Sequence, residues 1–140
     1  MFLKVMVAID GSETAFEALK EAKNIAASYH GTLCIVYAVG DSDDADQQAG
    51  IKLLEHAKSA VGEGLEVETR LLQAEAAYGL TGITAAITDA LKEWGDDLLV
   101  VGTANRRGLE RLVIGSVAEQ LIAKVDASVL LVRPRKQLIV

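Results

Sequence analysis

Residues 2–39 read FLKVMVAIDGSETAFEALKEAKNIAASYHGTLCIVYAV, which is an apolar run, a stretch with helical spacing and a second apolar run. The runs at 2–9 and 32–39 are rich in β-branched residues and nearly continuous in hydrophobicity, which favours strands buried on both faces. Between them, alanine, leucine and isoleucine recur at helical spacing from Ala15 to Ala26. This order predicts a strand, a covering helix and a second, parallel strand.

The same alternation continues through the remaining chain. Further strands are predicted at 66–72, 97–101 and 128–133, separated by apolar stripes at helical spacing. The fold class is therefore α/β, with five strands in one parallel sheet covered by helices. We expect a single domain over residues 1–140, because this length supplies one core without a disulfide or a metal.

Composition narrows the choice of partners. The formal net charge of -6 argues against broad binding to nucleic acid or to an anionic membrane surface. The longest apolar run covers residues 33–39, far short of the roughly 18 residues of a membrane span. The first residues lack a signal-sequence pattern, so we expect a cytoplasmic protein.

Helix ends and loops follow from local signals. Ser12 is predicted to be the N-cap of the first helix, with His30 at the end of that helix and Gly31 just beyond it. Ser116 is predicted to cap the last helix, with Glu119 completing a capping box. Residues 40–50 are acidic and poor in apolar side chains, which predicts an exposed, mobile loop. Residues 73–82 suit either a helical extension or a loop.

The second and fourth helices are predicted from apolar stripes. These stripes include Ile51 in the second helix and Ile122 in the fourth. Cys34 is expected to be an inert thiol buried in a strand. His30 and His56 are far apart in a chain without a Cys/His cluster, so no metal site is expected.

Candidate binding residues follow strands one and four, since an open parallel sheet binds ligands beyond the carboxyl ends of its strands. Asp10, Gly11 and Ser12 follow the first strand, a glycine-containing segment with Arg106 follows the fourth, and Gly115 and Ser116 open the last helix. A helix N-terminus with glycine and serine is a natural phosphate site. The alternative is that these residues only form a turn, a cap and a solvated face.

Residues 100–119, VVGTANRRGLERLVIGSVAE, carry a resemblance. Together with residues 7–12 and 129–133, they resemble the universal stress protein family. In the ATP-binding branch of that family, the motif is a glycine, any two residues, a second glycine, any nine residues, and then glycine followed by serine or threonine. The resemblance covers the whole chain. It implies a doubly wound, Rossmann-like sheet in the strand order 3-2-1-4-5, with helices on both faces.

The resemblance also implies roles at the matching positions. Asp10 would lie near the adenosine and ribose, the backbone of Ala38 and Val39 would meet the adenine edge, and Gly102 would face the ribose and phosphates. Phosphate donors would come from Gly115, Ser116 and Val117. The implied ligand is ATP, with or without Mg²⁺, and the expected binding residues are Asp10, Gly11, Ser12, Ala38, Val39, Gly102, Thr103, Asn105, Arg106, Gly108, Gly115, Ser116 and Val117.

Asn105 departs from the motif, because it occupies the second glycine. Asparagine tolerates the left-handed region, so binding is retained if that glycine serves only backbone conformation. If a phosphate lies close to this position, the added side chain crowds it or donates to it. A second departure is the length of segment 73–82, where the family usually has a shorter crossover.

Three functions follow from these patterns. The first is a regulatory protein that senses or sequesters ATP with at most slow hydrolysis, and the chain lacks the Gly-Lys-Ser/Thr of P-loop enzymes. The second is an enzyme on a related doubly wound scaffold, such as a nucleotidyl transferase. Those enzymes typically carry paired histidines where this chain has Asp10-Gly11-Ser12. The third is a stress-associated adaptor that does not bind ATP, which Asn105 supports. The first and third functions, which both belong to the family, predict a homodimer paired through the exposed last strand.

Overall fold

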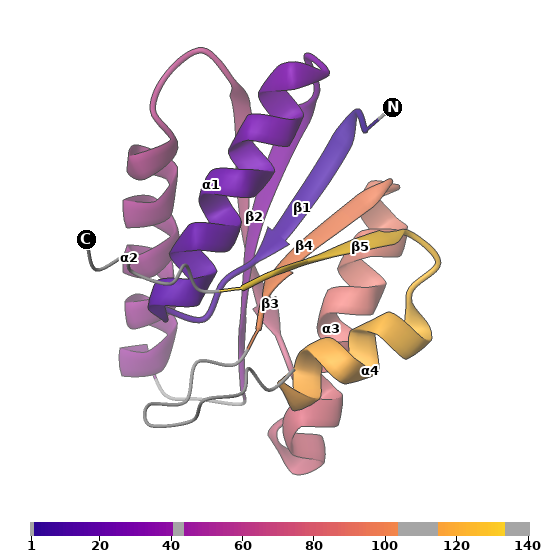
Figure 1. The fold of residues 1–140 in the computed structure, drawn as a ribbon. Coiled ribbons are helices and arrows are strands. Elements are labelled where there is room, and N and C mark those ends of the chain that lie inside the picture. The colour runs from indigo at the N-terminus through magenta and orange to yellow at the C-terminus, as the bar shows by residue number, and fades with distance from the viewer. Residues whose placement is uncertain (1, 41–43, 104–114, 134–140) are drawn as a thin grey trace, which may run out of the picture.

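Five parallel strands form the centre of the computed structural model, which describes residues 2–40, 44–103 and 115–133. Strands and helices alternate along the chain as predicted, and Figure 1 shows their arrangement. The elements are β1 (Lys4–Ala8), α1 (Glu13–Ser28), β2 (Thr32–Val39), α2 (Asp44–Val61), β3 (Glu66–Gln73), a 3-10 turn (Ala76–Tyr78), α3 (Gly79–Trp94), β4 (Leu98–Gly102), α4 (Ser116–Lys124) and β5 (Ser128–Val132).

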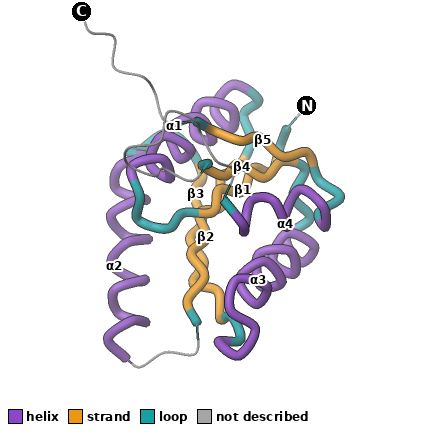
Figure 2. The backbone as a smooth tube through the Cα atoms, turned by 60° about the horizontal axis from the view of Figure 1, so that its bottom comes forward, coloured by secondary structure: helices purple, strands orange, loops and turns teal. Residues whose placement is uncertain are grey.

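The strand order is β3-β2-β1-β4-β5, which confirms the predicted doubly wound sheet. Central β1 pairs with β2 on one side and β4 on the other, so Val7 lies beside Ile35 and Val100. Helices α1 and α2 cover one face and α3 and α4 cover the other, as Figure 2 shows. The order reverses between β1 and β4, so the carboxyl ends of these strands flank the crevice where such sheets bind ligands.

Side chains alternate between two cores, one on each face of the sheet. Val5 and Val7 pack toward α1 and α2, whereas Met6 and Cys34 pack toward α3 and α4. The buried position predicted for Cys34 is confirmed, and burial raises the pKa of its thiol to about 12. A thiol of this kind stays protonated and unreactive.

Helix α1 begins as predicted, but its end differs from the prediction. The Ser12 hydroxyl accepts a hydrogen bond from the Ala15 amide at 3.1 Å, which confirms the N-cap. The helix ends at Ser28, before His30, and His30 rather than Gly31 takes a positive φ of 54°. Gly31 is required for another reason, since an added Cβ would lie 2.5 Å from the Leu3 carbonyl oxygen.

The prediction of a loop at residues 40–50 is wrong for its second half. Helix α2 begins at Asp44, and its acidic first turn suits the positive end of the helix dipole. Gln47 and Gln73 exchange side-chain hydrogen bonds of 2.9 and 2.8 Å, which tie this turn to the end of β3. Gly50 is buried, and an added Cβ would lie 2.8 Å from a methyl group of Leu71.

Two further predictions are refined. Segment 73–82 contains the 3-10 turn and the start of α3, so it is largely helical. Ile51 and Ile122 do not face the core, because their exposed fractions are 38% and 47%.

Within the described parts of the chain, no helix combines the length and the hydrophobicity needed to cross a membrane.

Candidate functional site

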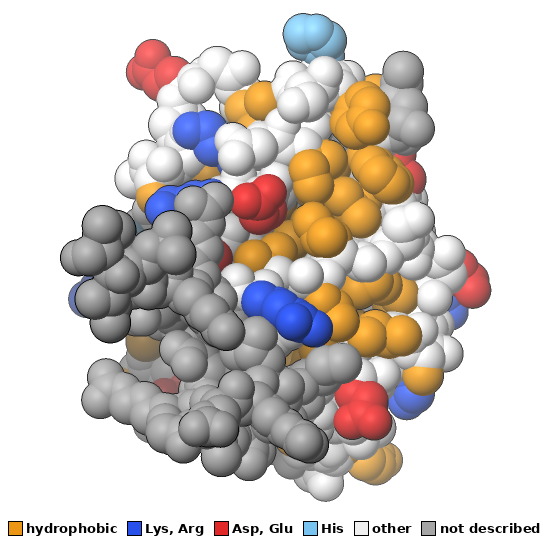
Figure 3. Space-filling view, viewed as in Figure 1, with side chains coloured by type: hydrophobic (Ala, Val, Ile, Leu, Met, Phe, Trp, Pro, Cys, Tyr) orange, Lys and Arg blue, Asp and Glu red, His pale blue; other side chains and the backbone are white. Residues whose placement is uncertain are grey.

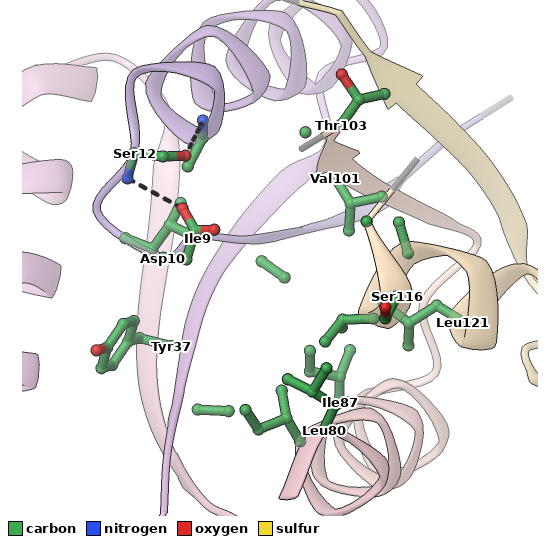
Figure 4. Close-up of a pocket in the computed structure, with 18 residues that line it drawn as sticks. Ile9, Asp10, Ser12, Tyr37, Leu80, Ile87, Val101, Thr103, Ser116 and Leu121 are labelled. Carbon is green, nitrogen blue, oxygen red and sulfur yellow. Dashed lines mark hydrogen bonds between the residues drawn. The ribbon is translucent and has the colours of Figure 1, made fainter. Parts of the chain in front are cut away.

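A cavity of about 460 Å³ opens at the carboxyl edge of the sheet, where β1 and β4 end beside α1, α3 and α4. This is the crevice at which the strand order reverses, and the volume suits a small organic ligand. Figure 4 shows the cavity with its lining side chains. The lining consists of Ala8, Ile9, Asp10, Ser12, Ala15, Tyr37, Ala38, Leu80, Ile83, Ile87, Val101, Gly102, Thr103, Gly115, Ser116, Val117, Ala118 and Leu121.

The turn after β1 forms one polar side of the cavity. Asp10 is exposed, and its Oδ1 accepts a hydrogen bond from the Ser12 amide at 3.0 Å (Figure 4). Gly11 has a φ of 85°, a conformation that strongly favours glycine. The turn therefore fixes the Asp10 carboxylate at the rim of the cavity, where it can accept from ligand hydroxyl or amino groups.

The start of α4 forms a second polar side. Gly115, not Ser116, is the N-cap, and it has extended backbone (φ −64°, ψ 154°) without a side-chain cap hydrogen bond. The predicted capping box is therefore wrong, and Ser116 is an exposed first residue of the helix. The first amides of α4 have no acceptor within the helix. They lie at the cavity, where the helix dipole favours an anion.

The end of β4 places Thr103 beside the cavity. Thr103 is 6% exposed, and its Oγ1 is buried without a hydrogen-bond partner among the described residues. Its amide donates to the Val132 carbonyl at 2.9 Å, which holds this segment against β5. The hydroxyl is closed off from the cavity by its burial, and Figure 4 shows it pointing away from the open space.

Packing within the protein also requires a glycine at position 102. An added Cβ would lie 2.7 Å from Cγ2 of Thr14 and 3.0 Å from its carbonyl oxygen. Thr14 belongs to the first turn of α1 and is buried. The motif glycine at the end of β4 therefore allows α1 to lie close to the sheet at the edge of the cavity.

The structure brings most of the predicted binding residues together. Eight of them line the cavity: Asp10, Ser12, Ala38, Gly102, Thr103, Gly115, Ser116 and Val117. Gly11 shapes the turn, and Val39 lies at the end of β2 with its carbonyl accepting from the Ala74 amide at 2.7 Å. Asn105, Arg106 and Gly108 lie outside the described residues.

The apolar wall of the cavity was not among the predicted binding residues. Leu80, Ile83 and Ile87 come from α3, and Tyr37 precedes Ala38 on β2. In the sequence, the spacing of Ile83 and Ile87 indicates an apolar helix face. It does not distinguish a face that packs in the core from one that lines a ligand site. The cavity therefore combines amide and hydroxyl donors on one side with an apolar wall on the other, which suits an anionic molecule that carries an apolar ring.

Comparisons with known proteins find relatives that match nearly the whole chain. Residues 1–133 match the model of the universal stress protein family. The universal stress protein MJ0531 of Methanocaldococcus jannaschii is 29% identical, over 98% of this chain and 86% of that protein.

Two solved structures of similar proteins are complexes with a nucleotide. The universal stress protein of Archaeoglobus fulgidus in complex with dAMP has a TM-score of 0.75 and 26% identity, over 93% of this chain and 97% of that one. A universal stress protein in complex with cAMP has a TM-score of 0.69 and 27% identity, over 94% and 97% of the two chains. Proteins similar to this chain therefore bind nucleotides.

Proposed function

This chain belongs to the universal stress protein family, and on that premise we propose that it is a regulatory protein that binds ATP or a related adenine nucleotide. It would sense or sequester the nucleotide in a stress response, with at most slow hydrolysis. The observation that carries the proposal is the cavity at the carboxyl edge of the sheet, with the Asp10 turn and the start of α4 at its border. The cytoplasmic location stays a prediction.

The residues present fit a nucleotide. The first amides of α4 and the Ser116 hydroxyl would donate to phosphate oxygens. The Asp10 carboxylate would accept from the ribose or the base. Complexes of similar proteins with dAMP and cAMP support the nucleotide class.

A substitution at Gly115 tests this assignment. The backbone of Gly115 has a negative φ, so valine can occupy the position without backbone strain. We expect Gly115→Val to block the approach of phosphate and to weaken ATP binding by at least about a hundredfold, or about 2.7 kcal/mol. Calorimetric titration measures the affinity, and circular dichroism should show unchanged helix content. Unchanged affinity would place the phosphate site elsewhere.

The sheet edge supports a second part of the proposal, a homodimer. Strand β5 lies at the edge of the sheet, and residues 129–132 are only half-buried. Figure 3 shows hydrophobic side chains gathered on the face that β5 crosses. Strand pairing across a twofold axis would cover both the apolar side chains and the unpaired backbone groups. A monomer at micromolar concentration in light scattering would contradict the dimer.

An adaptor that does not bind ATP is the competing function within the family. It is favoured by Asn105, which stands at the second glycine of the motif. On this alternative, Gly115 and Ser116 only begin a helix and the dimer surface carries the function. The two functions differ in one observable, the binding of adenine nucleotide by the purified protein.

A further inference from the structure

A second cavity, of about 330 Å³, lies between α1 and α2 and is called the α1–α2 groove below. Helix α2 ends at Val61, beside the middle of α1 (Figure 1), and the small side chain of Ala60 in its last turn leaves space there. The groove shares no described residue with the cavity at the carboxyl edge of the sheet. Its lining consists of Phe16, Leu19, Lys20, Lys23, Asn24, Ala60 and Val61.

The floor of the α1–α2 groove is apolar. Leu19 and Val61 are 3% and 2% exposed, and Phe16 beside them is half-buried. The Phe16 ring packs edge-on against His56 of α2, with ring centroids 5.7 Å apart, so an aromatic contact joins the two helices at the groove. An apolar floor in a cavity of this size suits the hydrocarbon part of a small molecule.

The polar rim of the groove comes from α1 and carries positive charge. Lys20 and Lys23 are three residues apart and therefore neighbours on the helix surface, and Asn24 adds an amide donor. The Lys20 ammonium lies 3.6 Å from the Glu17 carboxylate, but its side chain is 73% exposed, so this pair contributes little. Lys23 is half-buried and forms no ion pair with any residue that the structure describes.

The charge of the groove is opposite to that of the protein. The formal net charge of the chain is -6, whereas the described residues that line the groove include two lysines and no acidic side chain. This local charge favours an anion. The lining is too small for a protein partner, because a stable protein interface takes about 20–30 residues from each side. A small molecule fits the volume better.

We propose that the α1–α2 groove binds a small amphipathic anion, a carboxylic acid with an aliphatic body of medium length. The aliphatic body would lie on Leu19 and Val61, and the burial of its surface would favour association. The carboxylate would accept hydrogen bonds from the Lys20 and Lys23 ammonium groups. It would lie on the α1 side of the groove, because the carbonyl end of α2 carries partial negative charge. This site does not depend on nucleotide binding.

Titration of the full chain with octanoate tests the site, with nitrogen-15 amide spectra as the readout. We expect the largest shifts at groove residues such as Lys23 and Val61, and a dissociation constant below about 1 mM. The neutral analogue 1-octanol has the same aliphatic body without the charge. It should bind about tenfold more weakly, because it loses the charge-assisted hydrogen bonds.

Two substitutions separate the charge of the groove from its shape. Lys23→Gln removes one charge and should weaken octanoate binding about fivefold. Lys124→Gln is the matched control, because Lys124 is exposed on α4 and does not line the groove, and it should leave the affinity unchanged. Ala60→Phe fills the groove from an exposed helix position and should abolish octanoate binding, with unchanged helix content in circular dichroism.

Several results would overturn the proposal. These are no shifts at several millimolar octanoate, shifts that gather at the cavity of the carboxyl edge, equal binding of 1-octanol, and octanoate binding that survives Ala60→Phe. A change of oligomeric state in Ala60→Phe, measured by light scattering, would also overturn it, because a second copy of the chain would then cover the groove. Nucleotide binding is measured separately with ATP, so either proposal can fail while the other stands.

Discussion

Asp96 provides a direct test of the electrostatics of this fold. It precedes β4, at the amino end of the sheet and away from the cavity. Both of its carboxylate oxygens are buried and have no hydrogen-bond partner among the described residues. Burial and the nearby Asp97 charge raise the pKa of Asp96 from 3.8 to about 8, although Lys4 and Arg70 act in the opposite direction.

The sign of the effect on stability follows from the raised pKa. The folded protein keeps the Asp96 proton up to about pH 8, whereas the unfolded chain releases it near pH 3.8. The unfolded state therefore binds fewer protons between these values, and this group's contribution to stability falls as pH rises through the window. The full pKa difference corresponds to about 6 kcal/mol. Although the two carboxylate oxygens are buried, the residue as a whole is only partly buried. Screening by the nearby water therefore lowers the expected effect to about 2–3 kcal/mol.

Replacing Asp96 by asparagine keeps the shape and removes the ionisation. At about pH 8.5 we expect Asp96→Asn to be more stable than the natural protein by about 2–3 kcal/mol, with a much smaller gain at about pH 4.5. Urea unfolding at both pH values measures the difference. Asp126→Asn is the control, because Asp126 is exposed and lines the same small cavity of about 80 Å³ as Asp96. A gain that is absent at the higher pH, or equal at both, would refute the reasoning.

Two further substitutions concern the motif that follows β4. Gly102→Ala should lower the free energy of unfolding by about 1–3 kcal/mol, because the new Cβ meets Thr14, and an unchanged urea midpoint would contradict this contact. Asn105→Gly should alter the affinity for ATP by less than about tenfold, or 1.4 kcal/mol, if asparagine only fills a backbone position that favours glycine. A much larger gain in calorimetry would show that the natural residue opposes binding.

The sheet and the covering helices were predictable because buried strands and amphipathic helices leave different periodicities in the sequence. Ser12 was predictable as a cap for a similarly local reason. The start of α2 was not, because residues 44–50 carry few apolar side chains and are held by the Gln47–Gln73 pair. That contact joins segments far apart in the sequence, which composition does not reveal.

The candidate site shows the same division between local and tertiary signals. Gly115 and Ser116 were found from a glycine–serine helix start, but which of the two is the cap depends on backbone geometry. Leu80 was missed because its signal is an exposed fraction at a cavity mouth, a tertiary property. Gly102 was assigned to ligand approach, and its contact with Thr14 emerges only when α1 is placed beside β4.

Nucleotide binding is the central claim, and calorimetric titration of the purified, nucleotide-stripped protein with ATP and AMP, with and without Mg²⁺, tests it most directly. The account predicts a dissociation constant in the micromolar range, or about −8 kcal/mol at 1 μM. It also predicts loss of this binding in Gly115→Val. No binding up to millimolar nucleotide would contradict the account and would leave the adaptor function.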